Sequence, residues 1–206
     1  MAYLTGIDLG TSSLKVIIMD DDGVTHGSGC QPYQFESPTN GYAEQHIDIW
    51  WQACCSSVKK AMAQLPEIKP EIVGIGISGQ MHGAVFLDKD MQEVRPAILH
   101  CDARSGEQVT AIQNRLGEQA VQELMGNPVY TGFLLPSLLW VRENEPKAYE
   151  RIRHVLLPKD YLRFRLTGEL CSDYSDASAT LAFDLDTMDW SREIFNAFDI
   201  PHMLVS

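Results

Sequence analysis

Short apolar runs separated by polar turns fill the first part of the chain. Residues 3–9, 14–19 and 27–33 each have the length and the apolar content of a β-strand. The polar turns GTSS and DDDG separate them, and turns this short join consecutive strands into hairpins. The pattern therefore predicts three antiparallel strands in succession.

A helix and a further strand come next. Over residues 48–65 the apolar side chains recur every three or four positions, which makes one helical face of Trp51, Cys55, Val58, Met62 and Leu65. Residues 71–78 (EIVGIGIS) are almost all apolar, which is typical of a strand buried on both faces. Because a helix connects this strand to the earlier ones, we expect it to run parallel to its neighbour.

The remaining pattern is one short strand followed by helices. Residues 84–87 read as the strand and 88–92 as its closing turn, and helical patterns cover 105–116, 118–125, 136–143 and 158–166. This order of elements predicts an α/β fold with a mixed sheet and flanking helices. It resembles the ribonuclease H-like domain of the actin-like ATPase superfamily.

Charge narrows the range of partners. The 206 residues include 28 acidic and 16 basic side chains, which gives a formal net charge of −12. An acidic surface repels nucleic acid and anionic lipid, so we expect neither as a partner. A phosphate-bearing ligand would have to be held locally, by backbone N–H groups, a cation or a metal ion.

The cysteines and the N-terminus bear on the compartment. The five cysteines are odd in number and form no CxxC pair, which favours free thiols in a reducing environment. We find no signal peptide, and no stretch approaches the roughly 20 apolar residues of a membrane span. We therefore expect a cytoplasmic protein.

The segment GIDLGTSSLK is a candidate phosphate site. A turn of this composition offers several N–H and hydroxyl donors, although a plain surface hairpin would use the same residues. The segment resembles the first phosphate motif of the actin-like ATPases, D-x-G-T/S-x-x-x-K. This resemblance implies that Asp8 organises Mg²⁺ and the transferred phosphate. The residues that it assigns to ATP are Gly10, Thr11, Ser12 and Lys15.

The segment SGQMHGA is a candidate sugar site. It lies where the apolar strand 71–78 ends, and ligand crevices in parallel α/β sheets lie beyond such strand ends. Gln80 and His82 carry amide and imidazole groups that suit hydroxyls. A structural histidine is the alternative at this position.

Six blocks in order along the chain resemble the FGGY carbohydrate kinases, and most closely the xylulokinase branch. They are GIDLGTSSLK, GIGISGQMHGA, RPAIL-x-x-D-x-R, GF-x-x-P-x-LLW, LLPKDYLRFRLTGE and SD-x-SDAS-x-T. The resemblance implies that residues 1–206 are the N-terminal domain of such a kinase. The implied reaction is transfer of the ATP γ-phosphoryl group, with Mg²⁺, to a ketopentose such as D-xylulose.

The resemblance also assigns residues to the sugar. Met81 and His82 correspond to the pair that contacts it, with Gln80 beside them. Asp102 corresponds to a sugar-side acid and Arg104 to an anchor of the same loop. A structural salt bridge between Asp102 and Arg104 explains these two residues equally well.

Departures from the family pattern concern the choice of sugar. His100 stands where the family commonly has a Trp that walls the sugar site, and we expect His100 to contact the substrate. Leu134 and Ser137 replace a commoner Thr and Lys. Asp173 and Asp176 resemble a segment that lines the cleft, and helix capping explains them equally well.

The family's general base lies in a glycine-rich, GGGD-like motif, which residues 1–206 do not contain. We therefore expect the base beyond Ser206 and a chain truncated before it, without the C-terminal domain. Such a fragment should be inactive alone and should expose apolar surface that favours a homodimer. The alternatives are a kinase for another substrate, such as gluconate or L-xylulose, and a non-catalytic sugar-binding module of the same fold.

Overall fold

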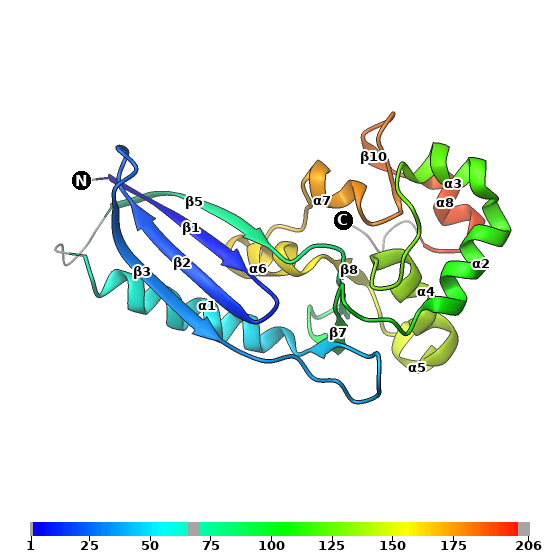
Figure 1. Cartoon of the computed structure of the whole chain (residues 1–206), viewed down its shortest axis with the longest axis horizontal. Coiled ribbons are helices and arrows are strands. Elements are labelled where there is room, and N and C mark those ends of the chain that lie inside the picture. The colour runs from blue at the N-terminus through cyan, green and yellow to red at the C-terminus, as the bar shows by residue number, and fades with distance from the viewer. Residues whose placement is uncertain (1, 66–70, 202–206) are drawn as a thin grey trace.

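A four-stranded sheet opens the fold in the computed structural model, which describes residues 2–65 and 71–201. The strands are β1 (Ala2–Leu9), β2 (Ser13–Met19), β3 (Thr25–Pro32) and β5 (Glu71–Gly79), in the order β3-β2-β1-β5. β2 pairs antiparallel with both β1 and β3, and β5 pairs parallel with β1 (Figure 1). These pairings confirm the predicted meander and the predicted parallel strand.

Helix α1 (Ile47–Met62) covers one face of this sheet, with a helical face one residue away from the predicted one. Its buried residues are Ile47, Trp50, Ala53, Cys54, Ser57 and Ala61, whereas the predicted Trp51, Cys55, Val58, Met62 and Leu65 are partly buried. Glycines on β3 explain the difference. A Cβ at Gly29 would lie 2.0 Å from the Ser57 carbonyl oxygen, and one at Gly27 would lie 2.3 Å from that of Ala61. The helix backbone therefore lies directly on the strand, where only small side chains fit.

β5 is not buried on both faces, so that prediction was wrong. Val73 and Ile75 are 59% and 53% exposed, because β5 is the edge strand of its sheet. Double burial belongs instead to β6 (Ala84–Leu87), all four residues of which are buried. Ala84 and Phe86 of β6 pack in the core of the helical end, and its other two residues pack in the core beneath the first sheet.

A second sheet lies between these two cores. It contains β4 (Glu44–Gln45), β7 (Glu93–Ile98), β6 and β8 (His154–Leu156), in the order β4-β7-β6-β8. Of these strands, only β6 was predicted from the sequence. β7 was not predicted because it contains Pro96, and proline has no N–H group to donate to a neighbouring strand. The ladder tolerates Pro96 because it lies where the register between β6 and β7 shifts.

Helices build the other end of the molecule (Figure 1). α2 (Gly106–Leu116), α3 (Glu118–Met125), α4 (Leu134–Asn144) and α6 (Pro158–Thr167) confirm the four predicted helices to within two residues at each end. The short elements that the sequence did not predict are α5 (Pro146–Tyr149), α7 (Tyr174–Ser178), β9 (Phe183–Asp184), β10 (Asp189–Trp190) and α8 (Arg192–Ala197).

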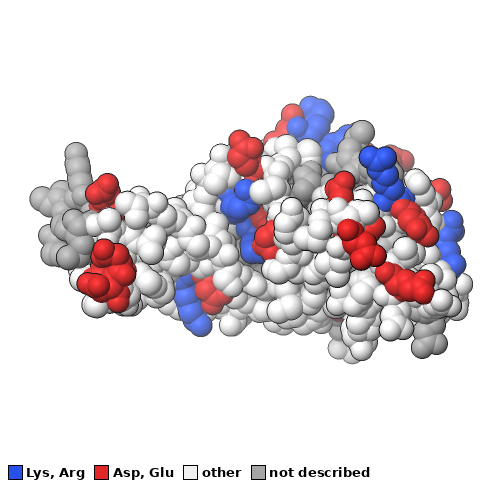
Figure 2. Space-filling view, turned by 90° about the horizontal axis from the view of Figure 1, so that it is seen from above, with Lys and Arg blue, Asp and Glu red and all other residues white. Residues whose placement is uncertain are grey.

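The surface carries its charges unevenly. Seen from above, acidic and basic side chains are interspersed over the helical end, while the sheet end shows acidic groups at its tip (Figure 2). The five cysteines are free thiols, as predicted. Within the described ranges, no helix is long and apolar enough to cross a membrane. The expected truncation concerns the end of the chain, and residues 202–206 lie outside the described residues.

Candidate functional site

The two candidate motifs meet at one edge of the first sheet. Because β1 and β5 are parallel, their carboxyl ends lie together, with Leu9 in register with Gly79. Directly beyond them, the backbone N–H of Gln80 donates to the carbonyl of Leu9 at 2.7 Å. The predicted phosphate turn and the predicted sugar segment therefore touch through their backbones.

Asp8 and Lys15 lie side by side on the sheet face opposite α1. Asp8 is in register with Lys15 on one side and with Ser78 on the other, and all three side chains are exposed or half-exposed. They line a hollow of about 490 Å³, whose floor contains Gly6 and Gly76. The glycines leave this face open, so a ligand can reach the Asp8 carboxylate.

The turn that follows Asp8 is held from outside by Tyr33. Gly10 N–H donates to the Ser13 carbonyl at 3.0 Å, and the Tyr33 hydroxyl donates to the Gly10 carbonyl at 2.6 Å. Burial, and then the charge of Asp8, raises the pKa of Tyr33, so this hydroxyl stays a donor. In the described structure the N–H groups of Thr11 and Ser12 donate to no protein group. These two N–H groups are available to an anion. The role of Tyr33 in holding the turn was not predicted from the sequence.

A single carboxylate beside such a turn suits Mg²⁺, which is usually held by one or two carboxylates plus substrate phosphates and water. Asp8 is the described residue that fits this task. Among residues 2–65 and 71–201, no group of three or more His, Cys, Asp and Glu side chains could hold a metal ion alone.

His82 lies in a strained turn within the sugar segment. Its φ is 66°, and the Gly83 N–H donates to the Met81 carbonyl at 2.8 Å, which defines a γ-turn. Strained backbone of this kind costs about 1–3 kcal/mol and clusters at functional sites. The Met81 side chain is 51% exposed. The turn thus presents two side chains of the predicted sugar pair.

Two polar side chains of the predicted site have buried atoms without a hydrogen-bond partner among the described residues. They are both amide atoms of Gln80, which is 7% exposed, and Nδ1 of His100. Burial, and then the charge of His82, lowers the pKa of His100, so its neutral form is favoured. Unpaired buried groups cost about 1–3 kcal/mol each, so these atoms are candidates for a partner outside the described residues.

Asp102 lies outside the open part of the site. Its side chain is fully buried, and its carboxylate accepts hydrogen bonds from the Ala43 N–H at 2.6 Å and from Nη2 of Arg104 at 2.7 Å. Arg104 also bonds Glu44 at 2.6 Å and stacks over the ring of Tyr42 at 3.8 Å. This is the structural salt bridge that the sequence left open, and it anchors the loop after His100.

Asp173 and Asp176 meet the half-buried side chain of Lys159. Nζ of Lys159 lies 2.6 Å from Asp160, 2.6 Å from Asp173 and 3.2 Å from Asp176. Asp173 is also the N-cap of α7, which is the capping alternative left by the sequence. Burial opposes ionisation of Asp173, but its bonds to Lys159 and Ser175 outweigh it and lower its pKa. The cluster fixes α7 against α6.

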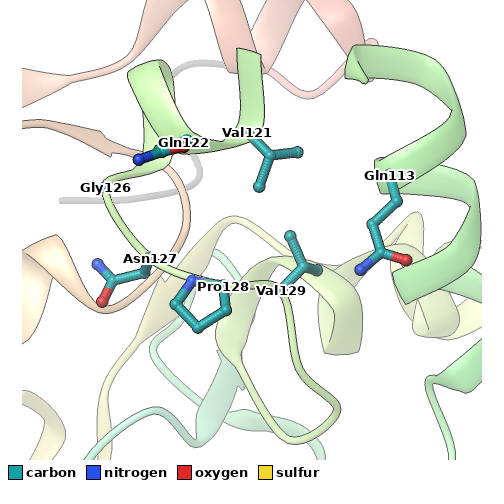
Figure 3. A pocket seen from close by; sticks show the side chains of 7 residues that line it. All are labelled: Gln113, Val121, Gln122, Gly126, Asn127, Pro128 and Val129. Carbon is teal, nitrogen blue, oxygen red and sulfur yellow. The ribbon is translucent and has the colours of Figure 1, made fainter. Parts of the chain in front are cut away.

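A larger hollow lies elsewhere, between α2, α3 and the segment that follows α3 (Figure 3). Its volume is about 640 Å³, and its lining residues are Gln113, Val121, Gln122, Gly126, Asn127, Pro128 and Val129. Val121 and Val129 point toward one another across it (Figure 3). None of the sequence-predicted site residues lines this hollow.

A family model matches nearly the whole chain: residues 3–206 match "FGGY family of carbohydrate kinases, N-terminal domain". The xylulose kinase of Lactococcus lactis subsp. lactis is 40% identical over 205 residues, which cover 100% of this chain and 41% of the relative. The xylulose kinase of Escherichia coli (strain K12) is 40% identical over 195 residues, which cover 95% and 40%. This chain therefore spans about two-fifths of the length of these curated relatives.

Solved structures share the fold. The crystal structure of a xyloylose kinase from Brucella ovis superposes with a TM-score of 0.93 and 36% identity, over 99% of this chain and 43% of that one. Plasmodium falciparum glycerol kinase with ADP superposes with a TM-score of 0.91 and 23% identity, over 100% and 42%. The second likeness concerns the fold alone. Together these matches confirm the predicted mixed α/β domain of the actin-like ATPase superfamily.

Proposed function

This chain belongs to the FGGY family of carbohydrate kinases, and we propose that it is the sugar-binding part of an enzyme that phosphorylates a ketopentose, D-xylulose above all. The phosphoryl donor in this proposal is Mg-ATP. The xylulose kinases that are 40% identical to the chain support this choice of sugar.

The observation that carries the proposal is the backbone contact between Leu9 and Gln80. A phosphoryl-transfer site must hold the phosphate and the accepting hydroxyl within bonding reach of one another. The free N–H groups after Leu9 suit a phosphate, and the polar groups after Gly79 suit a hydroxyl. Their adjacency at the joined ends of β1 and β5 supports the proposal that both requirements are met at one site.

Each group of the cleft has a task in this scheme. Asp8 would hold Mg²⁺, which offsets phosphate charge when bound. The N–H groups of Thr11 and Ser12, with the ammonium of Lys15, would orient the phosphates. The Gln80 amide and the His82 ring would bind sugar hydroxyls.

The group that accepts the hydroxyl proton is proposed to lie beyond Ser206, in a part of the protein that this chain does not include. Asp102 is a poor alternative base, because its side chain is fully buried and its oxygens are bonded to Arg104 and Ala43. The 206-residue chain is accordingly proposed to bind sugar without catalysing transfer.

A second candidate is a kinase for another sugar or a sugar acid, such as L-xylulose or gluconate. It is favoured by His100, a smaller and more polar group than the Trp common in the family, whose buried Nδ1 has no partner among the described residues. A hydrogen-bonding group at this position would discriminate among substrates by the position of their hydroxyl or carboxylate groups, which an apolar wall would not do.

Sugar-dependent ADP release by the full-length gene product tests the proposal. Mg-ATP is supplied with D-xylulose, L-xylulose, ribulose, gluconate or glycerol, and kcat/KM is compared. We expect D-xylulose to be preferred, Asp8→Asn to lower kcat with every sugar, and His82→Asn to raise KM for the preferred sugar. Preference for another sugar would favour the second candidate, and no ADP release with any sugar would favour a non-catalytic sugar-binding module.

A further inference from the structure

We propose that Phe133 is a positioning residue that holds the imidazole of His82 in its sugar-binding orientation. The proposal rests on the proposed function for the role of His82. The position of the ring itself is independent of that function and can be measured separately.

The two rings are stacked face to face. Their centroids are 4.1 Å apart and their planes differ by 6°. The ring of Tyr130 meets Phe133 edge-on, at 6.1 Å and 72°, and supports it from another side. Aromatic stacking of this kind contributes about 0.5–1.5 kcal/mol beyond area burial. A ring on one face of the imidazole also opposes its rotation about the Cβ–Cγ bond of His82.

The stack is needed because the other contact of the His82 ring is weak. Nδ1 of His82 lies 3.4 Å from the carbonyl oxygen of Ala179, near the outer limit of a hydrogen bond. Such a contact can choose the tautomer but cannot fix the ring. With Nδ1 donating to Ala179, Nε2 is the acceptor left for a sugar hydroxyl. No partner is found for Nε2 among the described residues.

Phe133 is itself held by the start of α4. It is the N-cap residue of that helix, and its carbonyl accepts the N–H of Ser137 at 3.1 Å. The preceding Gly132 has φ 76°, and a Cβ there would lie 2.1 Å from the His100 carbonyl oxygen. Only glycine therefore lets the Phe133 loop lie against the His100 strand end, which brings Phe133 into the site.

The same short turn lies against both His82 and the start of α4. Ala179 contacts His82, and the carbonyl of the next residue, Thr180, accepts the N–H of Leu135 at 3.2 Å. His82 and the start of α4 are thus tied to adjacent peptide groups after α7.

The test uses Phe133→Leu in the 206-residue chain and in the full-length gene product. By NMR, loss of the stacked ring should move the His82 ring protons downfield, because protons over an aromatic face are shielded. In the full-length enzyme, KM for the preferred sugar should rise about 2- to 10-fold, which corresponds to the loss of one stacked pair, while kcat changes much less. Phe133→Tyr and Phe133→Trp should restore both values.

Phe164→Leu is the control, because it removes a partly buried ring from α6, away from His82. Thermal melts of all variants report any general loss of folding. Unmoved His82 protons in Phe133→Leu, or equal effects in Phe164→Leu, would overturn the proposal. A downfield shift combined with an unchanged KM would also overturn it, because the ring would then not serve sugar binding. If the wild-type enzyme uses no sugar, the proposed function fails, and the proposal that rests on it fails too. The ring shift would then still show whether the stack exists.

Discussion

The backbone N–H of Gln80 donates to the carbonyl of Leu9 at 2.7 Å. This bond joins the end of the phosphate hairpin to the start of the sugar segment, although 71 positions separate the two residues (80 − 9). It exists because β1 and β5 run parallel and end together. A phosphate and a hydroxyl bound to these two segments would therefore be neighbours.

Gln80→Leu should stabilise the fold and weaken sugar binding. Both amide atoms of Gln80 are buried without a partner among the described residues, so a leucine of similar size removes a desolvation cost of about 1 kcal/mol or more. The matched control is Gln45→Leu, because Gln45 is equally buried but bonds Trp50 and Gln34. Thermal unfolding should show opposite signs for the two variants. Destabilisation by Gln80→Leu would mean that its amide is satisfied within the fold.

Gly29→Ala should destabilise the fold by about 3 kcal/mol, at the upper end of the usual cost of overpacking. The added Cβ would lie 2.0 Å from the Ser57 carbonyl oxygen, and backbone cannot yield as a side chain can. Gly76→Ala is the control, since a Cβ there meets nothing within 4 Å. Denaturant titration of both variants tests the close approach of α1 to β3. Equal midpoints would show that the helix lies farther from the strand.

Asp102→Asn should cost about 3–5 kcal/mol, because it leaves the guanidinium of Arg104 buried without its principal countercharge. Asp90→Asn removes an exposed partner of Lys89 and should cost less than about 1 kcal/mol. Urea unfolding measures both. If Asp102→Asn folds as stably as the wild type but loses sugar binding, Asp102 acts on the sugar and not on the loop.

Three histidines should titrate in a fixed order. Burial, and then the charge of His82, lowers the pKa of His100 below the ordinary 6.5, and burial lowers that of His154. A hydrogen bond to Glu93 raises the pKa of His46 above 6.5. NMR titration of the imidazole protons should therefore show His46 protonating first as the pH falls. A common midpoint for all three would contradict the described environments.

The same shifts fix the sign of the pH dependence of stability. His100 and His154 bind protons less readily when folded than when unfolded, so their contribution is full above pH 6.5 and falls as the pH drops through their lowered pKa values. His46 acts in the opposite sense, with a contribution that is full below pH 6.5 and lost as the pH rises through its raised pKa. His100→Gln should reduce the acid sensitivity, and His46→Gln should increase it.

Periodicity predicted the type of the long elements but not which faces they bury. An apolar run such as EIVGIGIS does not say whether its strand lies at the edge or the centre of a sheet, and β5 is at the edge. The offset face of α1 follows from Gly27 and Gly29, which act on the helix from a strand that precedes it. Short elements such as α7 depend on tertiary contacts, here the bonds between Asp173 and Lys159.

Sequence motifs predicted the candidate site but not the residues that hold its side chains in position. The sequence pointed to His82, yet the stacking partner Phe133 lies 51 positions away (133 − 82) and shares no periodic pattern with it. The "GF" of the fourth block was the available signal, because a glycine before an aromatic residue at a helix start suggests a required close approach. Tyr33 carried no comparable signal, since a tyrosine at a strand end is ordinary.

The most direct test of the central claim is NMR of the isotope-labelled chain during addition of D-xylulose. We expect shift changes centred on Gln80, Met81, His82 and His100, none of them around the hollow between α2 and α3, and their loss in His82→Asn. Changes confined to that hollow, or no change with D-xylulose or any sugar of the panel, would contradict the claim that this chain carries the sugar site at the joined ends of β1 and β5.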